Sequence, residues 1–153
     1  MLSQKINQDL KEAFKGKDDF RVGVLRLIIS ALRNKEIEKK GKEEEKELSD
    51  EETIEILGKE AKKRKEAAEI YNKGGRNDLA EKEKRELEII KKYLPEQLSE
   101  VEVEKIVKAV IEKVDVSASG GKEFGIIIGE AMKELKGKAD GKLVGEIIKR
   151  LLA

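Results

Sequence analysis

Apolar residues recur along this chain at the spacing of amphipathic helices, most clearly in residues 122–153. Two apolar stripes flank a turn at 136–142, and each stripe follows the three- and four-residue steps that share one helical face. The first stripe comprises Phe124, Ile127, Ile128, Ala131, Met132 and Leu135. The second comprises Leu143, Val144, Ile147, Ile148, Leu151 and Leu152. The pattern predicts two helices joined by a turn that is rich in glycine and lysine.

The N-terminal segment shows the same helical period. Ser3 is the expected N-cap of a first helix, and Gly16 is placed to end that helix as its C′ residue. One face of this helix is expected to carry Ile6, Leu10, Ala13 and Phe14. The pattern therefore predicts a short amphipathic helix at the start of the chain.

A second helix is predicted over residues 20–40, with Asp18 or Asp19 as its N-cap. Its centre at 22–32 is apolar almost all round, which is typical of the most buried helix of a domain. From 36 to 47 the chain is almost wholly charged, and we expect a solvated helix end followed by a mobile loop.

A long helical hairpin is predicted next. Ser49 and Glu52 form a capping box that opens a long helix. Its apolar stripe has heptad spacing and comprises Ile54, Leu57, Ala61, Ala68 and Tyr71. Arg64 occupies the position where this stripe calls for another apolar residue. After a glycine-rich turn, Asn77 or Asp78 is expected to cap an antiparallel helix. The stripe of this second helix comprises Leu79, Glu83, Leu87, Ile90 and Leu94.

Pro95 is the only proline, and the residue before a proline is pushed out of the helical region. We therefore predict a domain boundary here, with an N-terminal helical domain at 1–95 and a small C-terminal three-helix domain at 96–153. A second capping box at Ser99 and Glu102 opens the first helix of the C-terminal domain. The face of that helix comprises Val103, Ile106, Val107, Val110, Ile111 and Val114. The predicted fold class is all-α.

Composition narrows the possible chemistry. The 34 basic and 33 acidic residues nearly cancel, so nucleic-acid binding would need a local basic patch. The chain has no Cys and no His, which excludes disulfides and removes the commonest metal ligand and general base. We expect no cofactor, no metal site and no catalysis of its own. The high content of charged residues, 44%, is also typical of adaptation to high temperature.

The basic excess collects at the end of the chain, where five cations accompany two acids over residues 136–153. These candidate binding residues are Lys136, Lys138, Lys142, Lys149 and Arg150. A second basic cluster at 62–65 lies in mid-helix, where a solvated face is the simpler interpretation. Glycines also lie at two predicted helix starts. Gly120 and Gly121 precede one helix, at the end of a flexible loop at 117–121, and Gly141 lies at the start of the last helix. Helix N-termini attract phosphate, but glycine before a helix usually just forms a turn.

Several segments taken in order resemble the GatB/YqeY family, and the similarity covers essentially the whole chain. They lie at 25–27, 34–38, 65–69, 75–80, 93–99, 129–132 and 136–141. The resemblance implies a helical N-terminal part and a three-helix C-terminal part. The latter is similar to the tail of the B subunit of the glutamine-dependent amidotransferase that converts Glu-tRNA to Gln-tRNA, a tail that contacts tRNA away from the chemistry. A label of carbon–nitrogen ligase with glutamine as amide donor would be inherited from the larger enzyme.

These observations lead to three hypotheses. The first is a non-catalytic accessory protein that binds tRNA or an RNA–protein assembly, with the five cations on the sugar-phosphate backbone. The second is a protein-interaction module whose long hairpin docks on a translation or amidotransferase enzyme. The third is an enzyme of amide transfer. Because the sequence shows neither a membrane-spanning apolar run nor a signal peptide, we expect a cytoplasmic protein without membrane contact.

Overall fold

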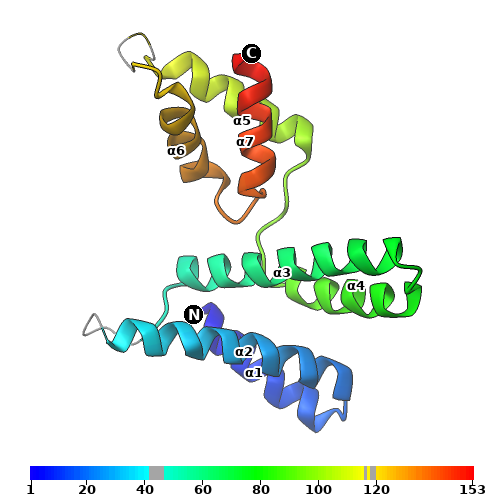
Figure 1. The fold of residues 1–153 in the computed structure, drawn as a ribbon. Helices are drawn as coiled ribbons and strands as arrows, with labels where there is room; N and C mark the ends of the chain where they lie inside the picture. Colours follow the sequence, from blue (N-terminus) through cyan, green and yellow to red (C-terminus); the bar gives the residue numbers. More distant parts are fainter. Residues whose placement is uncertain (42–46, 116, 118–119) are drawn as a thin grey trace. The chain divides into compact units, whose positions relative to one another are not determined.

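The computed structural model describes residues 1–41, 47–115, 117 and 120–153, and this part of the chain contains seven helices and no strand (Figure 1). The helices are α1 (Leu2–Lys15), α2 (Asp19–Lys40), α3 (Asp50–Lys73), α4 (Asn77–Lys91), α5 (Glu100–Lys113), α6 (Glu123–Leu135) and α7 (Gly141–Leu152). The predicted all-α class is confirmed. The two predicted loops include 42–46 and 118–119, which lie, together with residue 116, outside the described residues.

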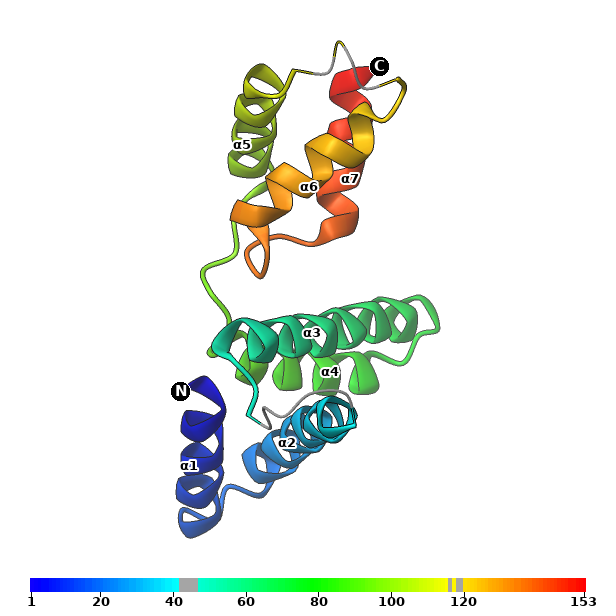
Figure 2. The same cartoon turned by 90° about the vertical axis from the view of Figure 1, so that its left-hand side faces the viewer.

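Backbone contacts divide the chain into two compact units, Met1–Leu94 and Pro95–Ala153. The N-terminal unit consists of two helical pairs, α1 with α2 and α3 with α4, which lie side by side in both views (Figures 1 and 2). Its core comprises Ile6, Ala13, Val22, Val24, Leu25, Ile28, Ile29, Leu32, Leu48, Leu57, Ile90 and Tyr93. Helix α2 supplies six of these buried residues, more than any other helix of the unit, as its continuous apolar centre predicted.

The beginning of α1 differs from the prediction. Met1, not Ser3, is the N-cap residue, and Ser3 lies inside the first turn. The backbone N–H of Leu2 donates a hydrogen bond of 2.8 Å to the carboxylate of Asp50, which is the first residue of α3. A side chain distant in sequence thus supplies the acceptor that a local cap would otherwise provide, so the helix can begin earlier than its own sequence indicates.

The end of α1 also differs by one residue. Gly16 is the C-cap with a right-handed conformation at φ −77°, and the left-handed C′ position falls on Lys17, at φ 56°. Two hydrogen bonds close the turn, from Asp18 N–H to the Ala13 carbonyl at 3.0 Å and from Lys17 N–H to the Phe14 carbonyl at 3.2 Å. This is a Schellman motif with lysine at the position that glycine normally occupies.

The other helix starts follow the predictions with one exception. The Asp18 side chain accepts the Arg21 N–H at 3.1 Å and caps α2. Ser49 and Ser99 each form the predicted capping box with the glutamate three residues later. At α4, however, Arg76 is the N-cap, and Asn77 is already the first helical residue. The Schellman turn that ends α3 accounts for the shift, since the Arg76 N–H donates to the Tyr71 carbonyl at 2.8 Å and α4 begins directly after it.

The predicted hairpin of α3 and α4 is present, and its anomalous Arg64 is buried. The guanidinium donates to the Glu60 carboxylate at 2.7 Å and to the Glu86 carboxylate at 3.2 Å. It also donates to the Glu60 backbone carbonyl at 3.0 Å. The acid buried on α4 is thus Glu86, whereas the predicted stripe placed Glu83 toward α3. Two carboxylates and a carbonyl compensate for burial of the cation.

The C-terminal unit packs α5, α6 and α7 around a small aliphatic core (Figure 2). The core comprises Val103, Val107, Ile127, Ala131, Leu135, Val144, Ile147 and Ile148. All eight residues belong to the predicted apolar faces of these three helices. Asp140 is the N-cap of α7, and its side chain accepts the Lys142 N–H at 3.1 Å.

Candidate nucleic-acid interface

Three of the five predicted cations lie around one turn. Lys136 and Lys138 belong to the connection between α6 and α7, and Lys142 lies in the first turn of α7. All three residues are exposed. Gly137 between the first two has φ 78°, a left-handed conformation that a residue with a Cβ rarely adopts. The turn thus depends on glycine at 137, and the exposed Lys136 and Lys138 lie on either side of it.

A segment distant in sequence holds this turn in place. The Gln97 side-chain amide donates to the Gly137 carbonyl at 2.7 Å and to the Pro95 carbonyl at 3.0 Å. The next residue, Leu98, donates its backbone N–H to the Lys138 carbonyl at 2.9 Å. The two segments that meet here are both among those that carry the family resemblance, although sequence reasoning had no reason to connect them. The backbone of this lysine turn, which comprises residues 136–142, is thus held in place within the C-terminal unit.

The helix N-termini contribute less to anion binding than the glycines suggested. At α7 the Asp140 carboxylate already accepts a backbone N–H, and its negative charge opposes a phosphate at the same place. Before α6, Gly120 and Gly121 have φ 61° and 89°, so these glycines are explained by the turn that they form. Any phosphate contacts in this unit would therefore come from the lysine side chains.

The other two predicted cations lie near the end of α7. Lys149 follows Lys142 by two helical turns on the same face, roughly 10 Å along the axis. Its ammonium lies 5.6 Å from the centroid of the Phe124 ring. Arg150 donates to Glu100 at 3.1 Å and to Glu104 at 3.0 Å, both on α5. Because two carboxylates already engage its guanidinium, Arg150 ties α7 to α5 and has less charge to offer a ligand.

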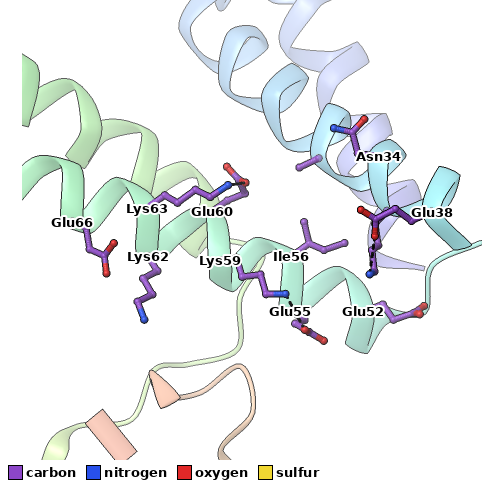
Figure 3. Close-up of a pocket in the computed structure, with 12 residues that line it drawn as sticks. Asn34, Glu38, Glu52, Glu55, Ile56, Lys59, Glu60, Lys62, Lys63 and Glu66 are labelled. Carbon is purple, nitrogen blue, oxygen red and sulfur yellow. Dashed lines mark hydrogen bonds and ion pairs between the residues drawn. The ribbon is translucent and has the colours of Figure 1, made fainter. Parts of the chain in front are cut away.

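The second basic cluster, at 62–65, has three exposed lysines and one buried arginine. Its members point in different directions around α3: Arg64 is buried, and Lys63 pairs with Glu60 at 3.0 Å. Lys62 and Lys63 border a groove of about 670 Å³ between α2 and α3 (Figure 3). The groove is lined by Ala31, Asn34, Lys35, Glu38, Glu52, Glu55, Ile56, Lys59, Glu60, Lys62, Lys63 and Glu66.

The charges of this groove largely neutralise one another. Figure 3 shows Lys59 reaching Glu55 on the same helix, at 3.2 Å, and Lys63 reaching Glu60. On α2, Lys35 pairs with Glu38 at 3.1 Å. Five acids face four lysines along the lining, so the groove has no positive potential that would attract nucleic acid.

A different exposed surface was missed by sequence reasoning. Phe14, which was predicted to lie on the apolar face of the first helix, is 65% exposed. It lines a hollow of about 390 Å³ formed by α1 and α2, together with Leu10, Lys11, Lys15 and Arg26. The sequence did contain a signal of this outcome, because Lys11 lies three residues before Phe14 and would have to share its face.

Within the described residues, no group of three acidic side chains is arranged to hold a metal ion. In the same part of the chain, no helix combines the length and apolar character needed to cross a membrane. The fold and the candidate site therefore define a small all-helical protein in two compact units, with a lysine-bearing turn on the second unit. The chain belongs to the YqeY family, whose model, described as Yqey-like protein, matches residues 3–152.

Similar curated proteins include fungal ones that carry the name Altered inheritance of mitochondria protein 41, mitochondrial. The protein of Lachancea thermotolerans is 40% identical over 90 residues, which cover 58% of this chain and 46% of the relative. The protein of Saccharomyces cerevisiae is 35% identical over 138 residues, or 88% of this chain and 68% of the relative. The matched region is thus about half to two thirds of these relatives.

These relatives overturn one prediction from the sequence. Their names assign them to mitochondria, so the prediction of a cytoplasmic location is wrong. The physical reason is that import into an organelle is directed by short targeting segments separate from the folded domain. The composition of the folded helices therefore does not record the compartment in which they work.

Proposed function

We propose that this chain is a non-catalytic accessory protein that binds tRNA or a tRNA-containing assembly through its C-terminal unit. The observation that carries the proposal is the lysine turn, in which Lys136, Lys138 and Lys142 surround a backbone held by Gln97 and Leu98. A turn whose backbone is already held loses little backbone entropy when its lysines meet a phosphate backbone. The resemblance to the tRNA-contacting tail of the amidotransferase B subunit favours the same ligand.

Recognition in this unit would rely on phosphates and on the shape of the RNA. The exposed cations of the turn are all lysines, which act as point charges toward phosphate. Double-stranded RNA is recognised mostly by its shape and its backbone, and the stem regions of tRNA offer such a surface. Lys149 extends the contact along α7, whereas Arg150 has a mainly structural role through its pairs with α5.

The alternative of a protein-docking hairpin has weaker support. A docking surface of this kind presents a contiguous apolar patch. Among the described residues of α3 and α4, Ile70 is the one large apolar side chain classed as exposed, at 68%. A single exposed isoleucine is ordinary for a soluble helix, so the hairpin surface favours the RNA hypothesis over the protein-docking hypothesis.

The test is tRNA binding by the full chain as a function of salt. Replacing Lys136, Lys138 and Lys142 by Ala should weaken binding to all tRNAs alike and flatten the log–log salt slope by roughly two to three units. A control variant removes the same charge elsewhere by replacing three exposed lysines of the hairpin, namely Lys73 on α3, Lys82 on α4 and Lys92, the C-cap of α4. This control should keep the parent salt slope.

An unchanged slope in the first triple variant, or an equal loss in the control, would contradict the proposed site. The same preparations should not hydrolyse glutamine or amidate Glu-tRNA. Either activity, if abolished by replacing a single carboxylate or serine, would establish an enzyme and refute the non-catalytic proposal.

A further inference from the structure

The hollow on α1 and α2 combines an exposed aromatic ring with several cations. Phe14 is 65% exposed, and the residues that surround it in the hollow are Leu10, Lys11, Lys15 and Arg26. No acid belongs to this lining. Two acids of α1 lie close in sequence to this lining: the Asp9 carboxylate accepts the Tyr93 hydroxyl at 2.5 Å and pairs with Arg21 at 3.8 Å, and the Glu12 carboxylate accepts from the Gln8 side-chain amide at 3.5 Å.

The arginines of this surface differ from the others in the chain. Five of the seven arginines have a partner: Arg21 with Asp9, Arg64 with Glu60 and Glu86, Arg76 with Asp78, Arg85 with the Phe20 ring, and Arg150 with Glu100 and Glu104. Arg26 and Arg33 have no such partner within the described residues. They lie seven positions apart on exposed positions of α2, so they share one face across two helical turns.

The surrounding sequence also lacks acids. From Phe20 to Lys35 there is no Asp or Glu, in a chain with 33 acidic residues overall. Elsewhere, many lysines of the helices pair with a glutamate three or four residues away, as Lys59 does with Glu55. On α2, Arg26 has no acid within four residues, and Arg33 has one, Glu36, three residues later, so the positive charge of Arg26 in particular is available to an anionic ligand.

We propose that Phe14, Lys11, Lys15, Arg26 and Arg33 form a second RNA contact, which takes an unpaired nucleotide of a loop or single-stranded end. The base would stack on the Phe14 ring, and the flanking phosphates would meet the cations, as in proteins that bind single strands through aromatic platforms in basic grooves. Arginine suits this role because its planar fork binds phosphate bidentately and also stacks on bases.

This inference rests on the proposed function only for the class of its ligand, because the surface belongs to the other compact unit and reads a different feature of RNA. The lysine turn offers point charges to a duplex backbone, whereas the hollow offers a ring to an unstacked base. An acidic protein segment would satisfy the charges, but it would leave the flat ring without a stacking partner. The two sites can therefore be tested separately.

The experiment uses the full chain with Lys136, Lys138 and Lys142 replaced by Ala, so that the lysine turn no longer contributes to RNA binding. The probes are a 12-nucleotide uridine oligomer and a blunt RNA duplex of the same length. Because the chain contains no Trp, Phe14→Trp introduces a single indole whose fluorescence reports a stacked base directly. Phe14→Leu is the matched variant that keeps an apolar side chain and removes the aromatic ring.

The single strand should bind more tightly than the duplex and quench the indole of Phe14→Trp. Phe14→Leu should bind the single strand on the order of 5- to 100-fold more weakly, with the salt slope retained. Arg26→Ala should reduce the slope by roughly 0.7, the value expected for one phosphate contact on a single strand. Circular dichroism should show native helix content in each variant.

Three results would overturn the proposal. Equal binding of the single strand by Phe14→Leu and its parent would exclude stacking, as would an indole that is not quenched. Equal competition by poly-glutamate of matched length would show that the surface recognises acidic polymers in general and would favour a protein partner. Failure of the lysine-turn test with tRNA leaves all three of these measurements unaffected, so the two proposals fail independently.

Discussion

The buried Arg64 cluster yields a quantitative prediction about how α3 and α4 are held together. The side chains of Arg64, Glu60 and Glu86 are 8%, 15% and 12% exposed, so water screens their charges only weakly. Glu60 precedes Arg64 by one helical turn, but Glu86 approaches from α4, which makes the contact of 3.2 Å between Arg64 and Glu86 the polar link between the two helices. We expect the cost of breaking this link to depend strongly on which partner is removed.

Arg64→Leu leaves two carboxylates in a site with little water, and removal of one side of a buried ion pair costs about 3–5 kcal/mol. Glu86→Leu leaves the arginine its two bonds to Glu60, so the loss should be about 1–3 kcal/mol, the cost of one unmade buried hydrogen bond. The double variant restores an apolar contact between the helices, and Glu60 keeps Lys63 at 3.0 Å. Its stability should lie within about 1 kcal/mol of the parent, since apolar replacements of buried pairs are often neutral.

The measurement is the free energy of unfolding in urea for the four proteins of this double-mutant cycle. The double variant should be less destabilised than the sum of the single variants by at least about 2 kcal/mol. Additive losses would refute the argument, because they would show that Arg64 and Glu86 stabilise the fold independently. A double variant as unstable as Arg64→Leu would show that the site cannot accept two leucines.

The cluster also predicts a pH dependence. Burial raises the pKa of Glu60, but hydrogen bonds from Arg64 and Lys63 outweigh it, and the net pKa lies below the ordinary value of 4.5. A carboxyl whose pKa is lower in the folded state stabilises the protein above its unfolded value, and this contribution disappears as the pH falls through the folded value. Arg64→Leu removes the main cation partner, so it should lose less stability than the parent between about pH 7 and pH 3. An unchanged acid sensitivity would contradict this assignment.

Two further predictions concern turns. Lys17→Gly should raise the free energy of unfolding by about 1 kcal/mol, because Lys17 has φ 56° and glycine adopts this conformation without a penalty from Cβ. The equivalent position after α3 is Gly75, at φ 73°, and Gly75→Lys should lower stability by a similar amount. If urea unfolding shows that both substitutions change the free energy of unfolding in the same direction, the comparison is refuted. Gln97→Ala removes the two bonds that hold Gly137 and Pro95, so it should weaken tRNA binding while the salt slope remains that of the parent. A reduced slope would instead indicate the loss of a phosphate contact.

Much of the fold was predictable because helices are defined by contacts between residues three and four positions apart. The capping boxes at Ser49 and Ser99, the Asp18 cap and the apolar centre of α2 depend only on such local spacing, and the structure has all of them. The anomaly at Arg64 was visible for the same reason, since a cation in an apolar stripe needs a compensating partner. The partner itself, Glu86, is 22 residues away and belongs to another helix.

The candidate site was predictable only in part. The lysines at 136–142 were recognised from composition, but their fixed display depends on Gln97, about 40 residues earlier, and no local rule connects the two. The pairing of Arg150 with α5 reduces its expected role for an equally nonlocal reason. The cellular compartment could not be predicted from the sequence of the folded helices.

The sequence by itself determined where this protein is helical, how most helices begin and which residues could face a core. Only the tertiary structure decided which of those faces is covered. Phe14 belongs to an apolar stripe yet is exposed, and Leu2 uses the carboxylate of Asp50 in place of a cap from Ser3. The physical reason is that helical periodicity follows from the geometry of one segment, whereas burial and the pairing of charges depend on which other segment packs against it.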